Sequence, residues 1–395
     1  MRFSRREFLR YTGLATASMM VPQIIKASGE FNLRVNGRCS VIIQLSGGND
    51  WLNTLPPIDN DLYHRARPKL GLKNSEIIRL NSHQGLHPEL KSLRALFDQG
   101  HLSILNGVGY PDPVRSHFRS MDIWQTASDS DVNLSTGWVG RTLDELGQTK
   151  PFLALELDDS LSLAMKGEKT KGLAISSTEA LYRTSQRPMV RALVAHDHEH
   201  DHKEVEYLYR TLSEVSTSAQ YLHKQNSIYR SSRAYPINAF GRGMKTIAEL
   251  IVSGCDSMVY YISLGGFDTH SGQALRHQRQ LSIYDHAVSA LMADLKENNK
   301  LNDVAVLTFS EFGRRVEQNA SGGTDHGAAG NVLLMGGSLR KPGIVNAAPD
   351  LTDLDDGDIR HKVDFRQIYA DLIGPWLGQR PEAVLGEGHV PFGLL

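Results

Sequence analysis

The chain has 395 residues, of which 40% are hydrophobic and 22% are charged, and its formal net charge is -1. A net charge near zero argues against nucleic acid or an anionic membrane surface as the main partner, because both require a basic excess. The sequence has no apolar run of about eighteen residues or more, so we expect no permanent membrane anchor. The length suits one large domain built around a single sheet, and we expect this domain to span residues 30–395.

Residues 1–29 have the parts of an export signal. The paired Arg5 and Arg6 are followed by a weakly apolar stretch over residues 11–25. This pattern resembles the twin-arginine class of signals, whose proteins cross the membrane folded and often carry a metal that was inserted beforehand. The resemblance implies recognition by the twin-arginine translocase and a periplasmic or extracellular location. A basic amphipathic helix that packs on the domain is the alternative.

The rest of the chain alternates between apolar runs of strand length and segments with helical spacing of apolar residues. Strands are expected at residues 40–45, 102–108, 152–157, 257–264, 304–309 and 332–335. Helices are expected at residues 88–97, 114–127, 204–229, 239–252 and 275–296. This alternation predicts an α/β fold with a largely parallel central sheet and helices on both faces.

Cys39 and Cys255 are the only cysteines, which excludes a zinc finger or zinc ribbon. Each stands just before an expected strand. If those strands are neighbours, the two sulfurs could form a disulfide in the periplasm. Two buried thiols are the alternative, and the sequence does not favour one over the other.

Four histidines alternate with acidic residues over residues 195–203. Such a segment could chelate a metal. Alternate residues do not share a face of a helix, however, so a solvated surface turn is the preferred interpretation.

In an open parallel sheet, ligands bind where loops leave the carboxyl ends of the strands, and four such ends here carry polar, glycine-rich segments. The first, residues 47–50 (Gly-Gly-Asn-Asp), offers Asp50 as a hard oxygen ligand. After the second strand, Ser116 lies near a predicted helix start, where free amides and the helix dipole favour an anion. Ser116 is therefore a candidate nucleophile beside the titratable groups of Arg115 and His117, or else an N-cap.

The third strand end, residues 265–270, carries the most metal-like pair in the chain. Asp268 and His270 are two residues apart, so in an extended segment their side chains point the same way and can converge on one ion. A polar loop without metal is the alternative. The fourth strand end and the glycine-rich loop after it supply Glu311, Arg314, Asp325 and His326.

Together these segments resemble a bacterial family of twin-arginine-exported proteins, the domain of unknown function numbered fifteen-oh-one. The resemblance is carried by residues 47–50, 115–118, 265–270, 310–314 and 324–327, and it extends over nearly the whole chain. The family is grouped with the alkaline phosphatase superfamily, which includes sulfatases. The resemblance therefore implies an alkaline-phosphatase-like fold and a divalent metal cofactor of one or two ions, with zinc, manganese or calcium as candidates.

The layout of that superfamily also implies roles for single residues. Three residues, Asp268, His270 and His326, match the ligands of one metal site in type and order. Asp50 and Glu311 match ligands of a second site, with Asp325 as a further candidate. Phe312 stands where that second site has a histidine, so a single ion is the alternative to two.

The implied function is hydrolysis of a small anionic ester of phosphoric or sulfuric acid. Ser116 matches the nucleophile of the superfamily, with Arg115, His117 and Arg314 as further candidate catalytic residues, the arginines to stabilise charge on the transferring group. A typical sulfatase is not expected, because the segment after Ser116 lacks the proline of the sulfatase motif. The alternative is a non-catalytic exported binding or assembly protein with a degenerate metal site, an interpretation that Phe312 favours.

Overall fold

The computed structural model describes residues 37–147, 150–195 and 203–395. The predicted export signal and nearly all of the histidine-rich segment lie outside these residues. No helix in the described ranges is long and apolar enough to cross a membrane.

A nine-stranded sheet forms the centre of the described chain, and β1 (Cys39–Leu45) lies near its middle. β1 pairs in parallel with β7 on one side and with β8 on the other. One strand, β11, runs antiparallel to its neighbours β4 and β8, and the remaining pairs are parallel. The other strands of the sheet are β4 (Leu102–Gly109), β5 (Ala154–Glu156), β6 (Leu173–Ala174), β7 (Val259–Leu264), β8 (Val304–Phe309), β11 (Gly330–Met335), β12 (Gly343–Ile344) and β15 (Val363–Asp364). The predicted largely parallel sheet is confirmed.

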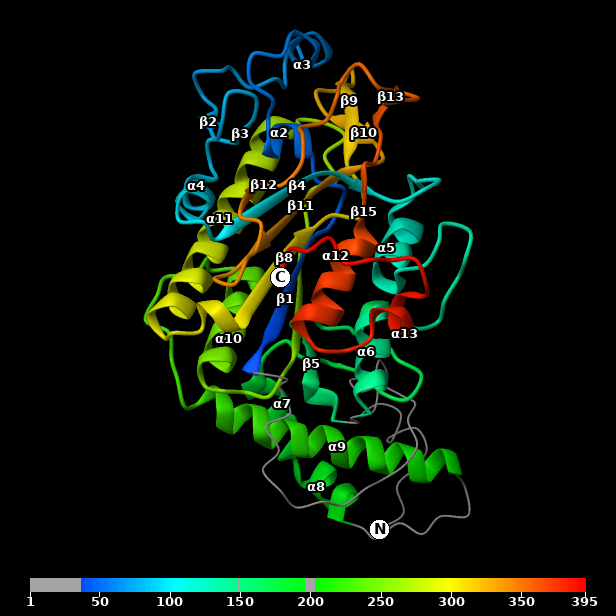
Figure 1. The fold of residues 1–395 in the computed structure, drawn as a ribbon. Coiled ribbons are helices and arrows are strands. Elements are labelled where there is room, and N and C mark those ends of the chain that lie inside the picture. Colours follow the sequence, from blue (N-terminus) through cyan, green and yellow to red (C-terminus); the bar gives the residue numbers. More distant parts are fainter. Residues whose placement is uncertain (1–36, 148–149, 196–202) are drawn as a thin grey trace.

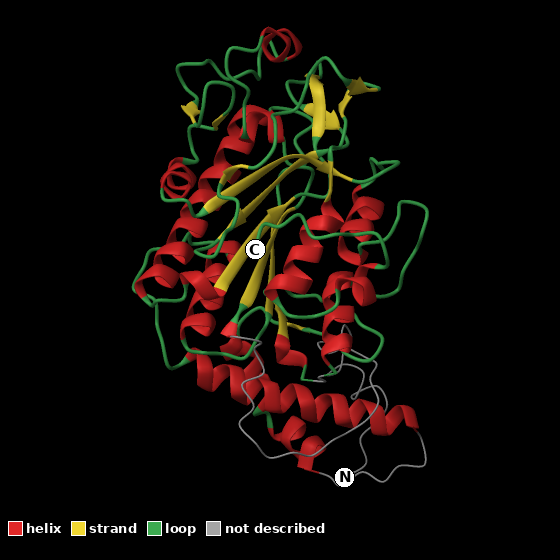
Figure 2. Cartoon of the chain, viewed as in Figure 1, coloured by secondary structure: helices red, strands yellow, loops and turns green. Residues whose placement is uncertain are grey.

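The central strands are mostly apolar and are buried along their whole length, because both faces of the sheet are covered. Every residue of β1, β4, β8 and β11 is buried. Helices pack on the two faces, as Figure 2 shows with the strands in yellow between helices in red. One face carries α4 (Lys91–Asp98), α10 (Ala239–Val252) and α11 (Gln273–Glu297), and the other carries α5 (His117–Thr126), α6 (Trp138–Leu146), α12 (Phe365–Asp371) and α13 (Pro381–Leu385) (Figure 1).

The predicted helices all occur, with small shifts at their ends. α4 begins at Lys91 rather than at residue 88, because Leu90 is its N-cap and the amides of Ser92 and Leu93 are satisfied by the Asp285 carboxylate of α11. Three more helices lie at the opposite end of the described structure from the carboxyl ends of the central strands. They are α7 (Thr178–Ser185), α8 (Pro188–Ala195) and α9 (Lys203–Asn226) (Figure 1).

Cys39 and Cys255 are both buried and are not joined by a disulfide. Ser40 is in register with Val259, so Cys39 lies opposite Met258 and not opposite Cys255. The register of β1 against β7 therefore selects the two-thiol alternative.

The carboxyl ends of β1, β4, β7 and β8 meet at one edge of the sheet, as the parallel pairing requires. β11 runs the other way, so the loop that precedes it reaches the same edge. Short elements surround this edge: α2 (Trp51–Thr54), α3 (Asp61–Ala66), β2 (Ile78–Arg79), β3 (Gly85–Leu86), β9 (Arg314–Gln318), β10 (Thr324–His326), β13 (Leu354–Asp355) and β14 (Asp358–Ile359). Single helical turns complete the fold at η2 (Pro151–Leu153), η3 (Leu163–Met165), η4 (Leu301–Asp303) and η5 (Leu372–Trp376).

Candidate metal centre

Three residues predicted as ligands of one ion meet at the carboxyl edge of the sheet. Asp268 and His270 follow β7, and His326 ends β10. The Nε2 atoms of His270 and His326 are 2.9 Å apart, and they lie 3.1 Å and 3.4 Å from Oδ1 of Asp268. Two imidazole lone pairs at this distance repel unless a proton or a cation lies between them, so the three side chains form a site for a positive charge.

His117, the first residue of α5, joins this cluster. Its Nε2 lies 3.4 Å from Oδ1 of Asp268 and is buried without a hydrogen-bond partner. The ligand atoms of His117, Asp268 and His326 all lie within 4.8 Å of one another, and these three residues could hold a metal ion. His117 could not be grouped with the ligands from the sequence, because only the fold brings the start of α5 next to the loop after β7.

Each of the three imidazoles has its other nitrogen, Nδ1, held by an oxygen acceptor. The pairs are His117 with Glu311 Oε1 at 2.9 Å, His270 with Asp325 Oδ1 at 3.2 Å, and His326 with the carbonyl oxygen of Arg115 at 2.8 Å. Because these oxygens accept, Nδ1 carries the proton and the Nε2 of a neutral ring keeps a free lone pair. Histidines that bind metals in proteins are oriented in this way.

The electrostatics of the centre keep Asp268 ionised. Burial alone would raise the pKa of Asp268, but a 2.7 Å hydrogen bond from Nη2 of Arg314 and the charge of that guanidinium lower the pKa to about 2. Burial lowers the pKa of His326, which favours its neutral form. The hydrogen bond with Glu311 raises the pKa of His117. The raised pKa favours the protonated form of His117, so a divalent cation would have to displace that proton before the carboxylate and the three imidazoles could bind it.

Arg314 is buried and forms hydrogen bonds with the backbone of several surrounding loops. Its guanidinium donates to the carbonyl oxygens of Gly48, Thr324 and Phe267 at 2.6, 2.8 and 3.1 Å, besides its bond to Asp268. The structure therefore places Arg314 as the clamp that positions Asp268. The predicted contact of Arg314 with a transferring group stays a prediction.

The residues predicted for a second ion are not brought into the cluster. Asp50 is 1% exposed, and its Oδ2 accepts a 2.6 Å ion-pair bond from Arg67 and a bond from Gln273. Burial would raise the pKa of Asp50, but the charge of Arg67, the charge of His277 and the hydrogen bonds from Arg67 and Gln273 together lower it. Glu311 lies behind His117 and accepts from the amide of Gly47 at 2.8 Å. Arg67 thus provides the positive charge beside Asp50, and Arg67 and Gln273 carried no signal in the sequence.

Phe312, which stands where the family resemblance implies a histidine ligand of a second ion, packs against the candidate centre. Its ring centroid lies 4.8 Å from that of His117 and 4.7 Å from that of His326. The aromatic ring therefore packs against two imidazoles of the centre and contributes no ligand atom.

Ser116 lies at the N-cap position of α5, directly before His117. Its side chain is exposed and makes no capping hydrogen bond, so the hydroxyl is not committed to the helix. The neighbouring Arg115 contacts the centre through its carbonyl oxygen, whereas its guanidinium pairs with Asp358 at 2.7 Å. Ser116 is therefore flanked by two residues that touch the candidate metal centre.

A family profile described as "Protein of unknown function (DUF1501)" matches residues 102–376, which is more than half of the chain. The chain belongs to this family. The family resemblance drawn from the sequence motifs is thereby confirmed. A search of curated proteins found no match for the DUF1501 chain.

Solved structures similar to the DUF1501 chain include the lipoteichoic acid synthase LtaP from Listeria monocytogenes, at 8% identity and a TM-score of 0.40 over 95% of this chain and 81% of that one. The periplasmic domain of EcEptC from Escherichia coli in complex with Zn is 12% identical, with a TM-score of 0.40 over 91% and 92% of the two chains. A protein of the alkaline phosphatase superfamily from Vibrio parahaemolyticus is 10% identical, with a TM-score of 0.34 over 96% and 78%. At these TM-scores the similarities do not assign an activity.

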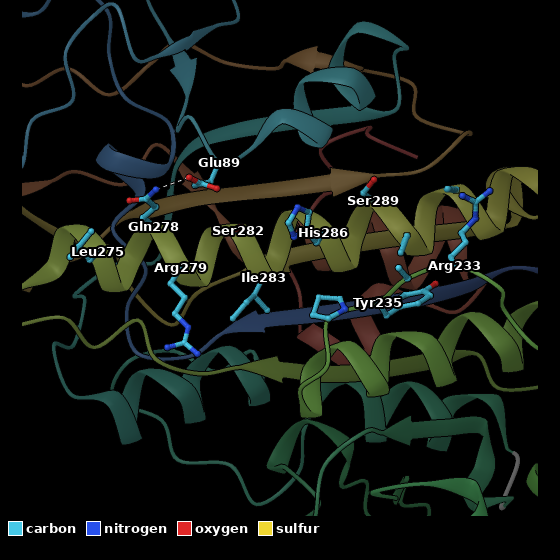
Figure 3. Close-up of a pocket in the computed structure, with 14 residues that line it drawn as sticks. Glu89, Arg233, Tyr235, Leu275, Gln278, Arg279, Ser282, Ile283, His286 and Ser289 are labelled. Carbon is cyan, nitrogen blue, oxygen red and sulfur yellow. Dashed lines mark hydrogen bonds between the residues drawn. The ribbon is translucent and has the colours of Figure 1, made fainter.

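The DUF1501 chain also has an open groove of about 890 Å³ along α11 (Figure 3). One wall is α11, with the exposed Leu275 and the half-buried Ile283, and the other includes residues 233–236. Gln278 donates a 2.7 Å hydrogen bond to Glu89 at its rim. None of the residues lining this groove belongs to the candidate metal centre.

Proposed function

We propose that this protein is an exported, metal-dependent hydrolase of phosphoric or sulfuric esters, with Ser116 as the nucleophile. The observation that carries the proposal is the convergence of four ligand atoms: Oδ1 of Asp268 and Nε2 of His117, His270 and His326. An exposed serine hydroxyl stands next to one of these ligands in the chain.

Four of the contacts among these ligand atoms have lengths close to those expected around one four-coordinate ion, and the atoms of His117, Asp268 and His326 all lie within 4.8 Å of one another. A metal held at about 2.0–2.1 Å by four ligands places neighbouring ligand atoms about 3.3 Å apart. The contacts between these atoms are 2.9, 3.1, 3.4 and 3.4 Å. Three imidazoles and one carboxylate suit zinc, and manganese less well, whereas calcium prefers a larger set of oxygen ligands. We therefore expect one zinc ion rather than two ions.

The chain supplies the other parts of an ester hydrolase around this site. Ser116 precedes the ten residues of α5, so the free amides and the positive end of the helix dipole favour an anionic phosphoryl or sulfuryl group beside its hydroxyl. Asp268, His117, His270 and His326 would hold the ion, which when bound acts as a Lewis acid on the ester oxygen and favours ionisation of a nearby hydroxyl. Arg314 keeps Asp268 in place and ionised.

A non-catalytic binding or assembly protein is the second candidate. The observation that favours it is the buried pair of Asp50 with Arg67, which removes one carboxylate from the chemistry. Metal would then be structural, and loss of the Ser116 hydroxyl would leave the biological activity intact.

The test is an assay of the zinc-loaded, manganese-loaded and metal-free protein with aryl phosphate, phosphodiester and aryl sulfate substrates. We expect turnover with zinc, and we expect Ser116→Ala to reduce kcat by at least about a hundredfold while zinc binding is retained. His326→Ala should lose both zinc and turnover. A zinc-loaded wild-type protein that hydrolyses none of these esters contradicts the proposal and leaves the binding protein.

Export of the folded chain by the twin-arginine translocase is a separate part of the proposal. It is supported by Arg5 and Arg6 before a weakly apolar stretch in residues 1–29. Residues 1–29 fused to a reporter that must fold before export should carry it into the periplasm, and the change of both arginines to lysine should stop transport. Transport of the lysine variant at the wild-type rate would contradict a twin-arginine signal.

A further inference from the structure

A small cavity of about 210 Å³ lies beside the candidate metal centre. Its lining includes Arg115, two residues before the ligand His117, and Ala328, two residues after the ligand His326. The two chain segments that carry these ligands therefore also form walls of the cavity. A molecule in the cavity would lie next to a group bound at the metal centre.

Two side chains that line the cavity have hydrogen-bonding atoms without a partner. Nε1 of Trp124 and Oδ1 of Asp358 are both buried and have no hydrogen-bond partner, although Oδ1 of Asp358 lies 3.8 Å from the Arg315 guanidinium; the two residues are 3% and 1% exposed. The Trp124 ring is held by stacking on Phe309 and Phe365. Oδ2 of Asp358 accepts a 2.7 Å bond from Arg115, which fixes that carboxylate. Buried polar atoms without partners are uncommon in native proteins and destabilise them, so these two atoms call for a ligand.

The two atoms are complementary in one respect. The indole N–H of Trp124 needs an acceptor, and Oδ1 of Asp358, which is ion-paired but not hydrogen-bonded, can accept from a donor. A hydroxyl group is both, so a molecule with several hydroxyls satisfies both atoms.

The size and charge of the cavity narrow the ligand further. An apolar cavity of about 150 Å³ admits a benzene ring, so 210 Å³ has room for one six-membered ring. The rim cations are already paired, since Arg360 and Lys362 bond to Asp353 at 2.9 and 3.0 Å. The cavity therefore has few unpaired cations to bind a second anionic group, but it has hydrogen-bonding atoms that neutral hydroxyls can satisfy.

We infer that this cavity binds a monosaccharide or cyclic polyol, and that it holds the alcohol part of the ester hydrolysed at the metal centre. The second half of this inference rests on the proposed function; the first half does not. The substrate class is then a phosphate or sulfate ester of a sugar, with the ester group at Ser116 and the ring in the cavity.

The test measures binding and turnover on the zinc-loaded protein. Saturation-transfer NMR with D-glucose reports binding without any reaction, and cyclohexanol serves as a ring of the same size with one hydroxyl. Ala328→Leu fills this cavity, and Ala348→Leu is the matched control, because Ala348 is a half-buried alanine that lines a neighbouring cavity of about 460 Å³. Trp124→Phe removes the indole N–H and keeps an aromatic ring, so it tests the inference if Ala328→Leu fails to fold.

We expect D-glucose to bind the wild type and Ala348→Leu, and we expect cyclohexanol to bind neither. Glucose binding should be lost in Ala328→Leu and weakened at least about tenfold in Trp124→Phe. The kcat/KM for glucose 6-phosphate relative to ethyl phosphate should fall in the same two variants. Absence of glucose binding to the wild type overturns the inference, and so does equal binding by Ala328→Leu and Ala348→Leu. Glucose binding with the predicted variant pattern but no ester turnover supports the sugar site and contradicts the proposed hydrolase.

Discussion

Asp268 is the residue on which the candidate centre depends. Its Oδ1 contacts the Nε2 atoms of three histidines and accepts from Arg314. The acceptors on the far side of each imidazole matter as much as the ligands, because they set which nitrogen carries the proton. Asp325, predicted from the sequence as a ligand, holds Nδ1 of His270 instead.

Asp325→Ala should weaken zinc binding about tenfold to a hundredfold, the usual effect of removing a partner of a ligating histidine. Asp325 is exposed, so the free energy of unfolding without metal should change little. Titration with a competing zinc chelator measures the affinity, and Asp159→Ala, at another exposed aspartate, is the control. Equal affinities for these two variants would show that Asp325 does not orient His270.

Asp50 shows what single-residue reasoning could not decide. An aspartate after the first strand fits a metal ligand by type and position, and the sequence offers no reason to pair it with a particular arginine. Arg67 reaches it only because α3 folds back over the loop after β1, and its guanidinium also donates to the carbonyl oxygens of Arg315 and Val316. One ion pair from a distant element thus gives Asp50 a partner other than a metal, which favours the alternative of one ion.

At the scale of elements, the centre depends on close contact between the loops after β1 and β7. Gly47 has a φ of +117°, and a Cβ atom there would lie 2.4 Å from the amide nitrogen of Asp268. Its own amide donates to Glu311. Only glycine lets the first loop pass this close to the ligand-bearing segment.

Gly47→Ala should push the Asp268 loop away from its histidines and lower both zinc affinity and the free energy of unfolding. We expect a destabilisation of about 1–3 kcal/mol, from backbone strain at a positive φ together with the steric contact. Urea denaturation of the metal-free protein and zinc titration measure the two effects. Gly265→Ala is the matched control, since Gly265 has open space around its Cβ position and should retain wild-type zinc binding.

Glu156 of β5, away from the metal centre, should make the stability of the fold depend on pH. Burial raises the pKa of Glu156 from 4.5 to about 7, despite the 2.7 Å hydrogen bond from the amide of Ser162. Between pH 4.5 and about 7, Glu156 is deprotonated in the unfolded chain but still protonated in the folded chain. The free energy of unfolding therefore falls as the pH rises through this range, and the contribution of Glu156 that is present below pH 4.5 is lost. The loss amounts to at most about 3 kcal/mol.

Glu156→Gln should remove this dependence. The check is the free energy of unfolding from urea titrations at several pH values between 4.5 and 8 for both proteins without metal. The difference between variant and wild type should increase in favour of the variant as the pH rises and then level off. A difference that stays constant over the range would mean that Glu156 titrates normally.

At the scale of the whole molecule, one bound ion would connect three separate parts of the chain. The ligands come from the start of α5, the loop after β7 and the end of β10. A ligand that binds only the folded state raises the free energy of unfolding by mass action, by about 2.7 kcal/mol when its free concentration is a hundred times Kd.

Removal of zinc by a chelator should therefore lower Tm, and re-addition should restore it. His326→Ala should have the Tm of the metal-free wild type or lower and should not respond to zinc. If zinc leaves the wild-type Tm unchanged at concentrations far above those in the binding titration, the ion does not bind at this centre of the folded protein.

Much of the architecture followed from the sequence alone. Largely apolar runs alternating with helical spacing predicted the sheet strands and helices, because a parallel sheet covered on both faces buries both sides of its strands. The same regularity placed four polar loops at one edge. The spacing of Asp268 and His270 predicted that these two side chains converge, and the family resemblance added His326 to them.

The tertiary structure decided the rest. It placed His117 among the candidate ligands, paired Asp50 with Arg67, left Cys39 and Cys255 without a disulfide between them, and formed a cavity lined by Arg115. These features depend on the register of strands and on side chains that meet across many residues of sequence. Local periodicity fixes which face of an element is buried, but it does not fix which residue of another element lies opposite, since only packing sets that pairing.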